Sequence, residues 1–232
     1  MDIYGKALLD YQNGKYLEDI KTYSTIGDED IYPLPYLFRN FNKMPKLEQE
    51  ALKLANGKIL DVGCGSGSHS LYLQSQNKDV FAIDISKGAV EVCKKRGLKN
   101  VALQDIWELK NQKYDTILLL MNGAGMCGTL DNLPHFLQHL STLLSKNGQI
   151  LLDSTDVKYL YEDEHGNYTI DVIKKYYGET TFVMEYKNEK GLAFDWLYVD
   201  FNTLQLLAEK CNLQCECILQ DDMDGYLARI TF

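Results

Sequence analysis

Three acidic residues in the middle of the chain each stand at the end of an apolar run. Asp61 lies in the stretch ILDVGCGSGSHSLYL, Asp84 ends DVFAID, and Asp105 ends NVALQD. In an open parallel sheet the carboxyl ends of the strands meet at one edge, and ligands bind there. Three carboxylates at that edge, with a glycine loop after the first, indicate a pocket for a phosphate-free nucleoside that carries a cationic centre.

The glycine loop contains Gly63, Gly65 and Gly67. Glycines let the backbone approach a ligand closely, and the N-terminus of a following helix favours a carboxylate or a phosphate. A dinucleotide site reads G-x-G-x-x-G/A, but here Ser68 occupies the third small position and the third glycine comes one residue early. Asp61 also adds a carboxylate for which a pyrophosphate has no use. The loop is therefore a poor match to a dinucleotide site.

The two later acids suit the rest of a nucleoside. Asp84 lies 19 residues after Gly65, and a carboxylate there can accept hydrogen bonds from both ribose hydroxyls. Asp105 is placed to receive an adenine amino group, with Ile106 and Trp107 packing against the ring.

The elements that must position these residues alternate between strand and helix. Beyond residue 57 we expect seven strands, with helices between them, at 58–63, 79–84, 100–105, 114–120, 148–154, 213–220 and 225–232. Such alternation is typical of an α/β fold with a doubly wound, mostly parallel sheet. The short loop QDDMDG predicts that the last two strands pair antiparallel.

Two segments fall outside this alternation. Residues 1–56 are expected to form a cap or lid of two or three short helices, because prolines interrupt them at 33, 35 and 45. The cofactor-binding domain is then 57–232, with an insertion at about 156–200. Within this insertion, 176–200 predict a hairpin whose strands alternate aromatic residues.

Composition restricts the function. The chain has 232 residues, a net charge of −9 and a pI near 5.0, which disfavours nucleic acid as a partner. No targeting signal is recognised, the most apolar run (117–121) is too short to span a membrane, and the six cysteines form no CxxC pair. His135 and His139 lack a third ligand, so no metal is predicted. We expect a soluble cytoplasmic monomer or homodimer.

The segments DVGCGSG, VFAIDIS and LQDIW resemble the class I S-adenosylmethionine-dependent methyltransferases, which have a Rossmann-like fold. The resemblance covers 58–155 and extends to the closing helix and strands. The segments YLFRNF and MPKLEQEAL are similar to bacterial members of the small-molecule type. The resemblance implies S-adenosyl-L-methionine as cofactor and S-adenosyl-L-homocysteine as product.

The resemblance also implies roles for individual residues. Asp61 would approach the methionine amino group, and the loop backbone would face the methionine portion. Asp84 would hold the ribose, while Asp105 and Ile106 would read the adenine. Met121 and Asn122 would lie near the transferable methyl group. The full predicted cofactor-binding set is Asp61, Gly63, Cys64, Gly65, Ser66, Gly67, Asp84, Ile85, Asp105, Ile106, Met121 and Asn122.

The acceptor side is less defined. After the fourth strand the sequence MNGAGMCG lacks the proline and aromatic residues that, in this family, often accompany methylation of nucleobase or glutamine amino groups. Candidates for the substrate side are Arg39, Tyr32, Tyr36 and Trp196. Arg39 could instead form a surface pair with Glu48, and the aromatic hairpin faces could simply complete the core.

The predicted function is methyl transfer from S-adenosylmethionine to a small-molecule O, N or C acceptor. No catalytic residue is assigned, because in this family the catalytic residues vary with the acceptor. The alternatives are a non-catalytic nucleoside-binding module, an NAD-dependent oxidoreductase, and a methyltransferase acting on a protein partner.

Overall fold

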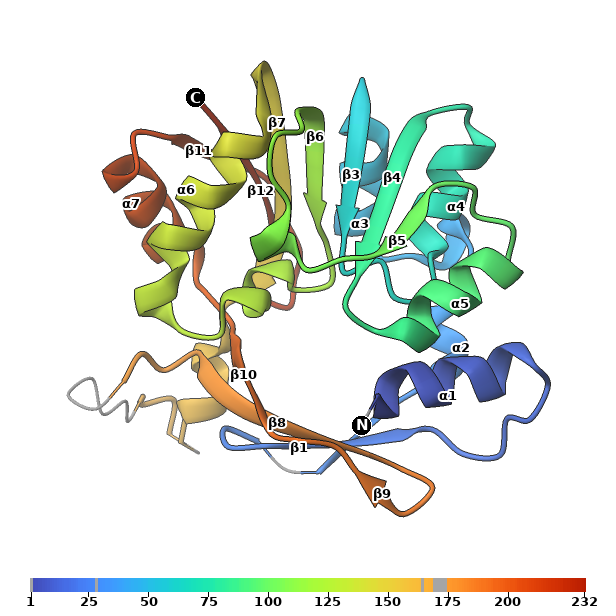
Figure 1. Ribbon diagram of the computed structural model, residues 1–232. Coiled ribbons are helices and arrows are strands. Elements are labelled where there is room, and N and C mark those ends of the chain that lie inside the picture. The colour runs from blue at the N-terminus through green and yellow to red at the C-terminus, as the bar shows by residue number, and fades with distance from the viewer. Residues whose placement is uncertain (1, 28, 164, 169–174) are drawn as a thin grey trace.

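The computed structural model describes residues 2–27, 29–163, 165–168 and 175–232. Its larger sheet has seven strands in the order β11-β12-β7-β6-β3-β4-β5 (Figure 1). The five parallel strands are β3 (Lys58–Val62), β4 (Asp79–Asp84), β5 (Val101–Leu103), β6 (Tyr114–Leu119) and β7 (Leu144–Thr155). The closing strands β11 (Gln214–Gln220) and β12 (Gly225–Thr231) run antiparallel. The predicted α/β fold with a mostly parallel sheet is confirmed.

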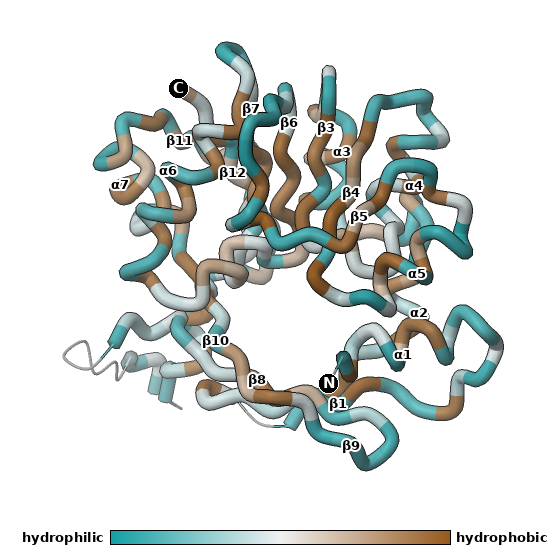
Figure 2. The backbone as a smooth tube through the Cα atoms, in the orientation of Figure 1, coloured by the Kyte–Doolittle hydropathy of each residue, from teal (hydrophilic) through white to brown (hydrophobic). Residues whose placement is uncertain are grey.

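Helices cover both faces of this sheet because its strands alternate two sets of apolar side chains. Ile59, Leu118 and Leu151 share a buried cluster with residues of α3 (Lys46–Leu54) and α4 (Ser68–Ser75). Their neighbours Leu60, Ile117 and Leu152 share another with α6 (Leu133–Leu143) and α7 (Phe201–Lys210). Figure 2 accordingly shows the central strands as largely hydrophobic.

Local capping signals define the helix that follows β4. Helix α5 (Lys87–Lys95) begins after Ser86, whose side chain accepts a hydrogen bond from the Ala89 amide, and serine is among the residues preferred at this capping position. It ends before Gly97, which has a φ of 90°. The cap of this helix thus lies two residues beyond Asp84, and the helix starts at the next residue.

A second sheet joins two distant parts of the chain. Its order is β10 (Phe194–Leu197), β8 (Glu179–Tyr186), β1 (Ile20–Ser24) and β2 (Asp30–Tyr32), and the short β9 (Glu189–Lys190) pairs with β8. The predicted hairpin is confirmed; Lys187 and Asn188, both with positive φ, form its tight turn. The sheet lies beyond the carboxyl-end edge of the larger sheet (Figure 1).

The short helices predicted in 1–56 are present, but the prediction missed two strands. Helices α1 (Ile3–Gln12), α2 (Leu34–Leu37) and α3 are present, but β1 and β2 lie between the first two. These strands are short, and β1 pairs with β8 more than 150 residues later, so no local pattern specifies them.

The 3-10 turns are η1 (Phe41–Lys43), η2 (Ile106–Glu108), η3 (Gly123–Cys127), η4 (Leu130–Asn132) and η5 (Val157–Tyr161). Among the described residues, no helix has the length and apolar character to cross a membrane.

Candidate active site

The strand order reverses between β3 and β6, which is the point where open α/β sheets bind ligands. The glycine loop follows β3. Asp84 and Asp105 follow on one side of this point, at the ends of β4 and β5. Met121 and Asn122 follow β6 on the other side, beside β7. The structure thus gathers the predicted strand-end residues along one edge of the sheet.

The glycine loop needs its glycines. Gly63, Gly65 and Gly67 have φ values of 70°, 55° and 83°, a region that other residues rarely adopt. A Cβ on Gly65 would also lie 2.7 Å from the hydroxyl oxygen of Tyr4, a residue of helix α1. Helix α1 therefore brings an aromatic side chain onto the loop.

Asp84 holds the glycine loop to the start of α5. Its carboxylate is buried and accepts hydrogen bonds from the amides of Gly65 at 2.8 Å and of Ser86 at 2.7 Å. Burial raises the pKa of Asp84. Each carboxylate oxygen has a second lone pair, so the group can still accept hydrogen bonds from a ligand.

The residues predicted to meet adenine have different exposures. Ile85 is 76% exposed, whereas Ile106 is buried in the core. Asp105 caps η2 by accepting a hydrogen bond from the Trp107 amide at 2.9 Å. Ile85 therefore offers the freer apolar surface at this end of the site.

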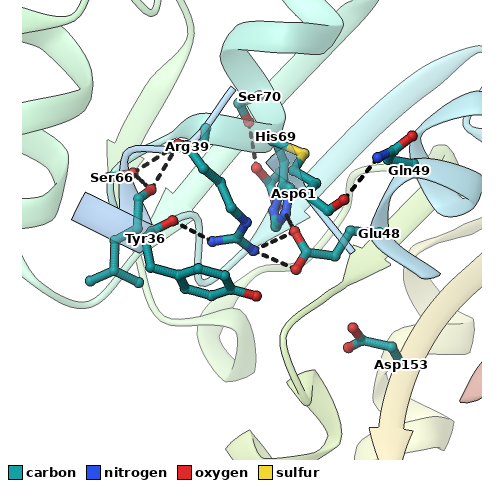
Figure 3. Close-up of polar contacts among 12 residues, drawn as sticks. Tyr36, Arg39, Glu48, Gln49, Asp61, Ser66, His69, Ser70 and Asp153 are labelled. Atoms are coloured by element: carbon teal, nitrogen blue, oxygen red, sulfur yellow. Dashed lines mark hydrogen bonds and ion pairs between the residues drawn. The ribbon is translucent and has the colours of Figure 1, made fainter. Parts of the chain in front are cut away.

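Arg39 lies in a buried cluster rather than at the surface (Figure 3). Its guanidinium donates to both carboxylate oxygens of Glu48, and Nη1 donates to the carbonyl oxygen of Tyr36 at 2.7 Å. The predicted partner Glu48 is confirmed, but the predicted surface location is wrong, because the two side chains are 3% and 4% exposed. Arg39 Nε is buried, and no described residue hydrogen-bonds to it.

His69 extends this cluster toward Asp61. Its Nε2 lies 2.6 Å from Glu48 Oε2, while Ser70 donates to Asp61 at 2.5 Å (Figure 3). Burial raises the pKa of Asp61, and Glu48 and Asp61 raise the pKa of His69 against the opposing effect of burial. The end of β3 is therefore a polar, water-poor region where charges interact strongly.

The end of β6 has an unusual backbone. Met121 and Asn122 both have a φ of 62°, which is unfavourable for residues with a side chain. Asp153 accepts a hydrogen bond from the Asn122 amide at 2.7 Å, and Ser154 Oγ donates to Asn122 Oδ1 at 2.6 Å. Burial raises the pKa of Asp153 to about 6. Strand β7 thus holds this backbone in place.

The aromatic candidates come from residues 1–56 and from strand β10. The Tyr36 ring lies 3.9 Å from the Arg39 guanidinium carbon. Burial raises the pKa of Tyr32, and its hydroxyl is near enough to Arg39, Tyr36 and Glu48 to interact with them electrostatically. Trp196 packs against η3, where a Cβ on Gly125 would lie 2.0 Å from the indole. The structure therefore brings Tyr32 and Tyr36 close to Arg39, whereas Trp196 covers the loop after β6.

Three residues of this site were missed by the sequence analysis, Tyr4, His69 and Asp153, and Glu48 was expected only as a surface partner of Arg39. Asp153 lies two residues before the end of β7, close to a strand end as the three predicted acids are, so the same pattern could have identified it. Glu48 and His69 gave no such signal, since helices commonly carry solvated polar residues.

A family model described as a methyltransferase domain matches residues 36–205, well over half of the chain. The chain belongs to the S-adenosylmethionine-dependent methyltransferases. The S-adenosylmethionine-dependent methyltransferase of Bacteroides fragilis, solved in complex with S-adenosyl-L-homocysteine, is 43% identical to it with a TM-score of 0.92. That similarity covers 99% of this methyltransferase and 94% of the Bacteroides chain.

Two curated relatives differ in their extent. The ubiquinone biosynthesis O-methyltransferase of Rickettsia prowazekii is 29% identical over 78% of this methyltransferase and 79% of its own length. The release factor glutamine methyltransferase of Buchnera aphidicola is 32% identical, but the match covers only 39% of each chain. This methyltransferase therefore spans about two fifths of the length of the Buchnera relative.

Proposed function

We propose that this methyltransferase binds S-adenosylmethionine across the strand-order reversal and transfers its methyl group to a small-molecule O, N or C acceptor. The observation that carries the proposal is the joining of Asp84 to Gly65, since it fixes a ribose-binding carboxylate and the glycine loop as one unit. The nucleoside end then lies at Asp84, Ile85, Asp105 and Ile106, and the methionine end lies over the loop.

The polar cluster suits the methionine end. Asp61 would accept a hydrogen bond from the amino group. Arg39 Nε, which has no partner in the part of the chain that the structure describes, would donate to the carboxylate. Glu48 already balances most of the Arg39 charge, so we assign Arg39 a role in orienting the methionine end. The backbone of Gly63, Cys64, Gly65, Ser66 and Gly67 would face the same portion.

A nucleoside at the β4 and β5 ends that continues over the β3 loop reaches β6 next. The methyl group would therefore lie at Met121 and Asn122. When bound, S-adenosylmethionine supplies an activated methyl carbon, and the protein contributes mainly alignment, which is worth up to about 7–11 kcal/mol.

Three features support a small acceptor. The second sheet covers the carboxyl-end edge, Trp196 covers the loop after β6, and the Rickettsia relative is named for a biosynthetic O-methyltransferase. We also propose that 1–56 form a cap and that 57–232 form the cofactor-binding domain, with an insertion at about 156–200. The cap would then combine the first segment with the insertion, since β1 pairs with β8.

Calorimetric titration with S-adenosylmethionine, S-adenosylhomocysteine and NAD tests the proposal. We expect the two sulfur nucleosides to bind and NAD not to bind. Binding of NAD alone would favour the oxidoreductase alternative and contradict the proposed function. Binding of the sulfur nucleosides without label transfer to any small-molecule fraction would favour the non-catalytic module.

A further inference from the structure

Asp153 is the fourth carboxylate near a strand end. Neither the proposed contacts with the cofactor nor the packing of the sheet fully explains why a carboxylate is buried at this position. It lies at the end of β7, next to the end of β6, where we place the transferable methyl group. Its side chain is only 8% exposed, and a buried carboxylate is costly unless it is compensated. The compensation comes from backbone amides, because both the Asn122 amide and the Met121 amide stabilise its ionised form.

These two amides point to Asp153 because their residues adopt a left-handed backbone. Met121 and Asn122 share a φ of 62°, a conformation that is unfavourable for residues with a side chain. Ser154 Oγ and the Leu197 carbonyl oxygen bind the Asn122 side chain at 2.6 and 3.3 Å, so the strand end is held from two sides. Backbone strain maintained in this way is typical of functional sites.

The surroundings of Asp153 indicate which ligands it can meet. Tyr36 from α2, Glu48 from α3 and His69 from α4 lie in its electrostatic surroundings, and Figure 3 shows its carboxylate pointing toward Glu48 and Tyr36. Arg39 and Glu48 neutralise each other. With Asp61 and Asp153 ionised, this cluster is therefore negative whether or not His69 carries a proton.

We propose that Asp153 faces the transferable methyl group and accepts the proton that an O–H or N–H methyl acceptor loses. This proposal rests on the proposed function and names its substrate class. A lone pair of the acceptor atom forms the bond to the methyl carbon, while the carbon–sulfur bond breaks and leaves its electron pair on sulfur. The acceptor proton passes to the Asp153 carboxylate and then to solvent. A neutral or cationic hydroxyl or amine compound fits this site, and a carboxylate acceptor does not.

The location of Asp153 can be tested without knowing the acceptor. S-adenosylmethionine and S-adenosylhomocysteine differ at the sulfonium methyl, so the ratio of their dissociation constants isolates the effect of charge there. We expect calorimetry from pH 5 to 8 to show the relative affinity for S-adenosylmethionine rising about 3- to 10-fold, as Asp153 ionises. This rise should disappear in Asp153→Asn and remain in Asp79→Asn, whose carboxyl lies at the start of β4.

His69 is the competing explanation, because its deprotonation would change the ratio in the same direction. The rise should therefore persist in His69→Gln. A ratio that stays constant with pH in the wild-type protein, or a rise that survives in Asp153→Asn, would overturn the proposal. Failure of both sulfur nucleosides to bind would instead contradict the proposed function itself.

The proton-accepting role is tested with three ring compounds: catechol, benzylamine and benzoate. We expect methyl label from S-adenosylmethionine to reach catechol or benzylamine, and this rate to fall at least about 10-fold in Asp153→Asn at pH 7. Transfer to benzoate would count against the role. So would a lack of transfer to both catechol, which has O–H groups, and benzylamine, which has N–H groups. Binding of S-adenosylhomocysteine by Asp153→Asn shows that the variant is folded.

Discussion

Gly88 meets the backbone of Gly5 where helices α1 and α5 cross. A Cβ on Gly88 would lie 2.5 Å from the Cα, the carbonyl carbon and the carbonyl oxygen of Gly5. Asp2 fixes the same crossing, since its carboxylate accepts hydrogen bonds from Gly88 N at 3.0 Å and Ser86 Oγ at 2.8 Å. This crossing brings Tyr4 onto the glycine loop.

The substitution Gly88→Ala should therefore push α1 away from α5. Alanine normally favours a helix, but here the backbone of Gly5 occupies the space of the methyl group. We expect the free energy of unfolding to fall by about 1–3 kcal/mol in urea denaturation. Lys87→Ala, an exposed position on the same helix, should change it by less than about 0.5 kcal/mol. Equal effects of the two variants would show that the helices can separate without cost.

Asp84→Asn should weaken binding of S-adenosylmethionine by about 1.5–3 kcal/mol, because charge-assisted hydrogen bonds are lost. The side-chain NH2 group of asparagine would also replace one of the two acceptor oxygens. It would face the backbone N–H of Gly65 or of Ser86, so one of these hydrogen bonds would be lost. Calorimetry measures the change, and Asp79→Asn at the opposite end of β4 is the control. An unchanged affinity would remove Asp84 from the cofactor site.

The ionisation of Asp153 should reduce stability as the pH rises. Burial raises its pKa to about 6 from 3.8, so the folded protein binds the proton more tightly than the unfolded chain does. Stability is thus lost between about pH 4 and pH 6. An asparagine side chain at this position would keep the hydrogen bond from the Asn122 amide without this loss. Asp153→Asn should therefore be more stable than the wild type by up to about 3 kcal/mol at pH 8.

The measurement for Asp153→Asn is chemical denaturation at a series of pH values. Other titrating groups are common to both proteins, so they cancel to first order in the difference. We expect the difference in the free energy of unfolding to shrink toward zero near pH 4. A difference that does not change with pH would mean that the folded protein does not perturb Asp153.

Glu48→Gln should be strongly destabilising. Although burial opposes it, His69 and Arg39 lower the pKa of Glu48, so its stabilising effect is present above the unfolded pKa and is lost as the pH falls through the folded value. At pH 7 the variant leaves the Arg39 charge buried without its counter-ion. We expect a loss of about 3–5 kcal/mol in the free energy of unfolding.

Glu50→Gln on the same helix provides the matched control for Glu48. Its partner Lys53 lies 3.3 Å away in an exposed pair, which is worth less than about 1 kcal/mol. If both variants lost the same small amount of stability, the Arg39 charge would have to be satisfied by another group or by water.

The acids near the strand ends show which features of the fold and site can be predicted from the sequence. Short apolar runs in the sequence indicate β3, β4, β6 and β7, and Ser86, a residue type that commonly caps helices, precedes the start of α5. The placement of the glycine loop, Asp61 and Asp84 near strand ends could then be predicted, because it depends only on residues near them in the chain. Local patterns also predicted a hairpin over 176–200, and the structure places its tight turn at Lys187 and Asn188.

Contacts between distant segments needed the tertiary structure. Arg39, Glu48 and His69 come from the segment after α2, from α3 and from α4, and their burial depends on how these elements pack. Strand β1 forms only because β8 supplies its hydrogen-bond partners. The sequence by itself determined the alternation of strands and helices and, through the segments DVGCGSG, VFAIDIS and LQDIW, the resemblance to the methyltransferases, since both depend on residues close together in the chain. Only the tertiary structure decided which charges are buried and which acid adjoins β6, because pairing between remote residues leaves no periodic signal in the chain.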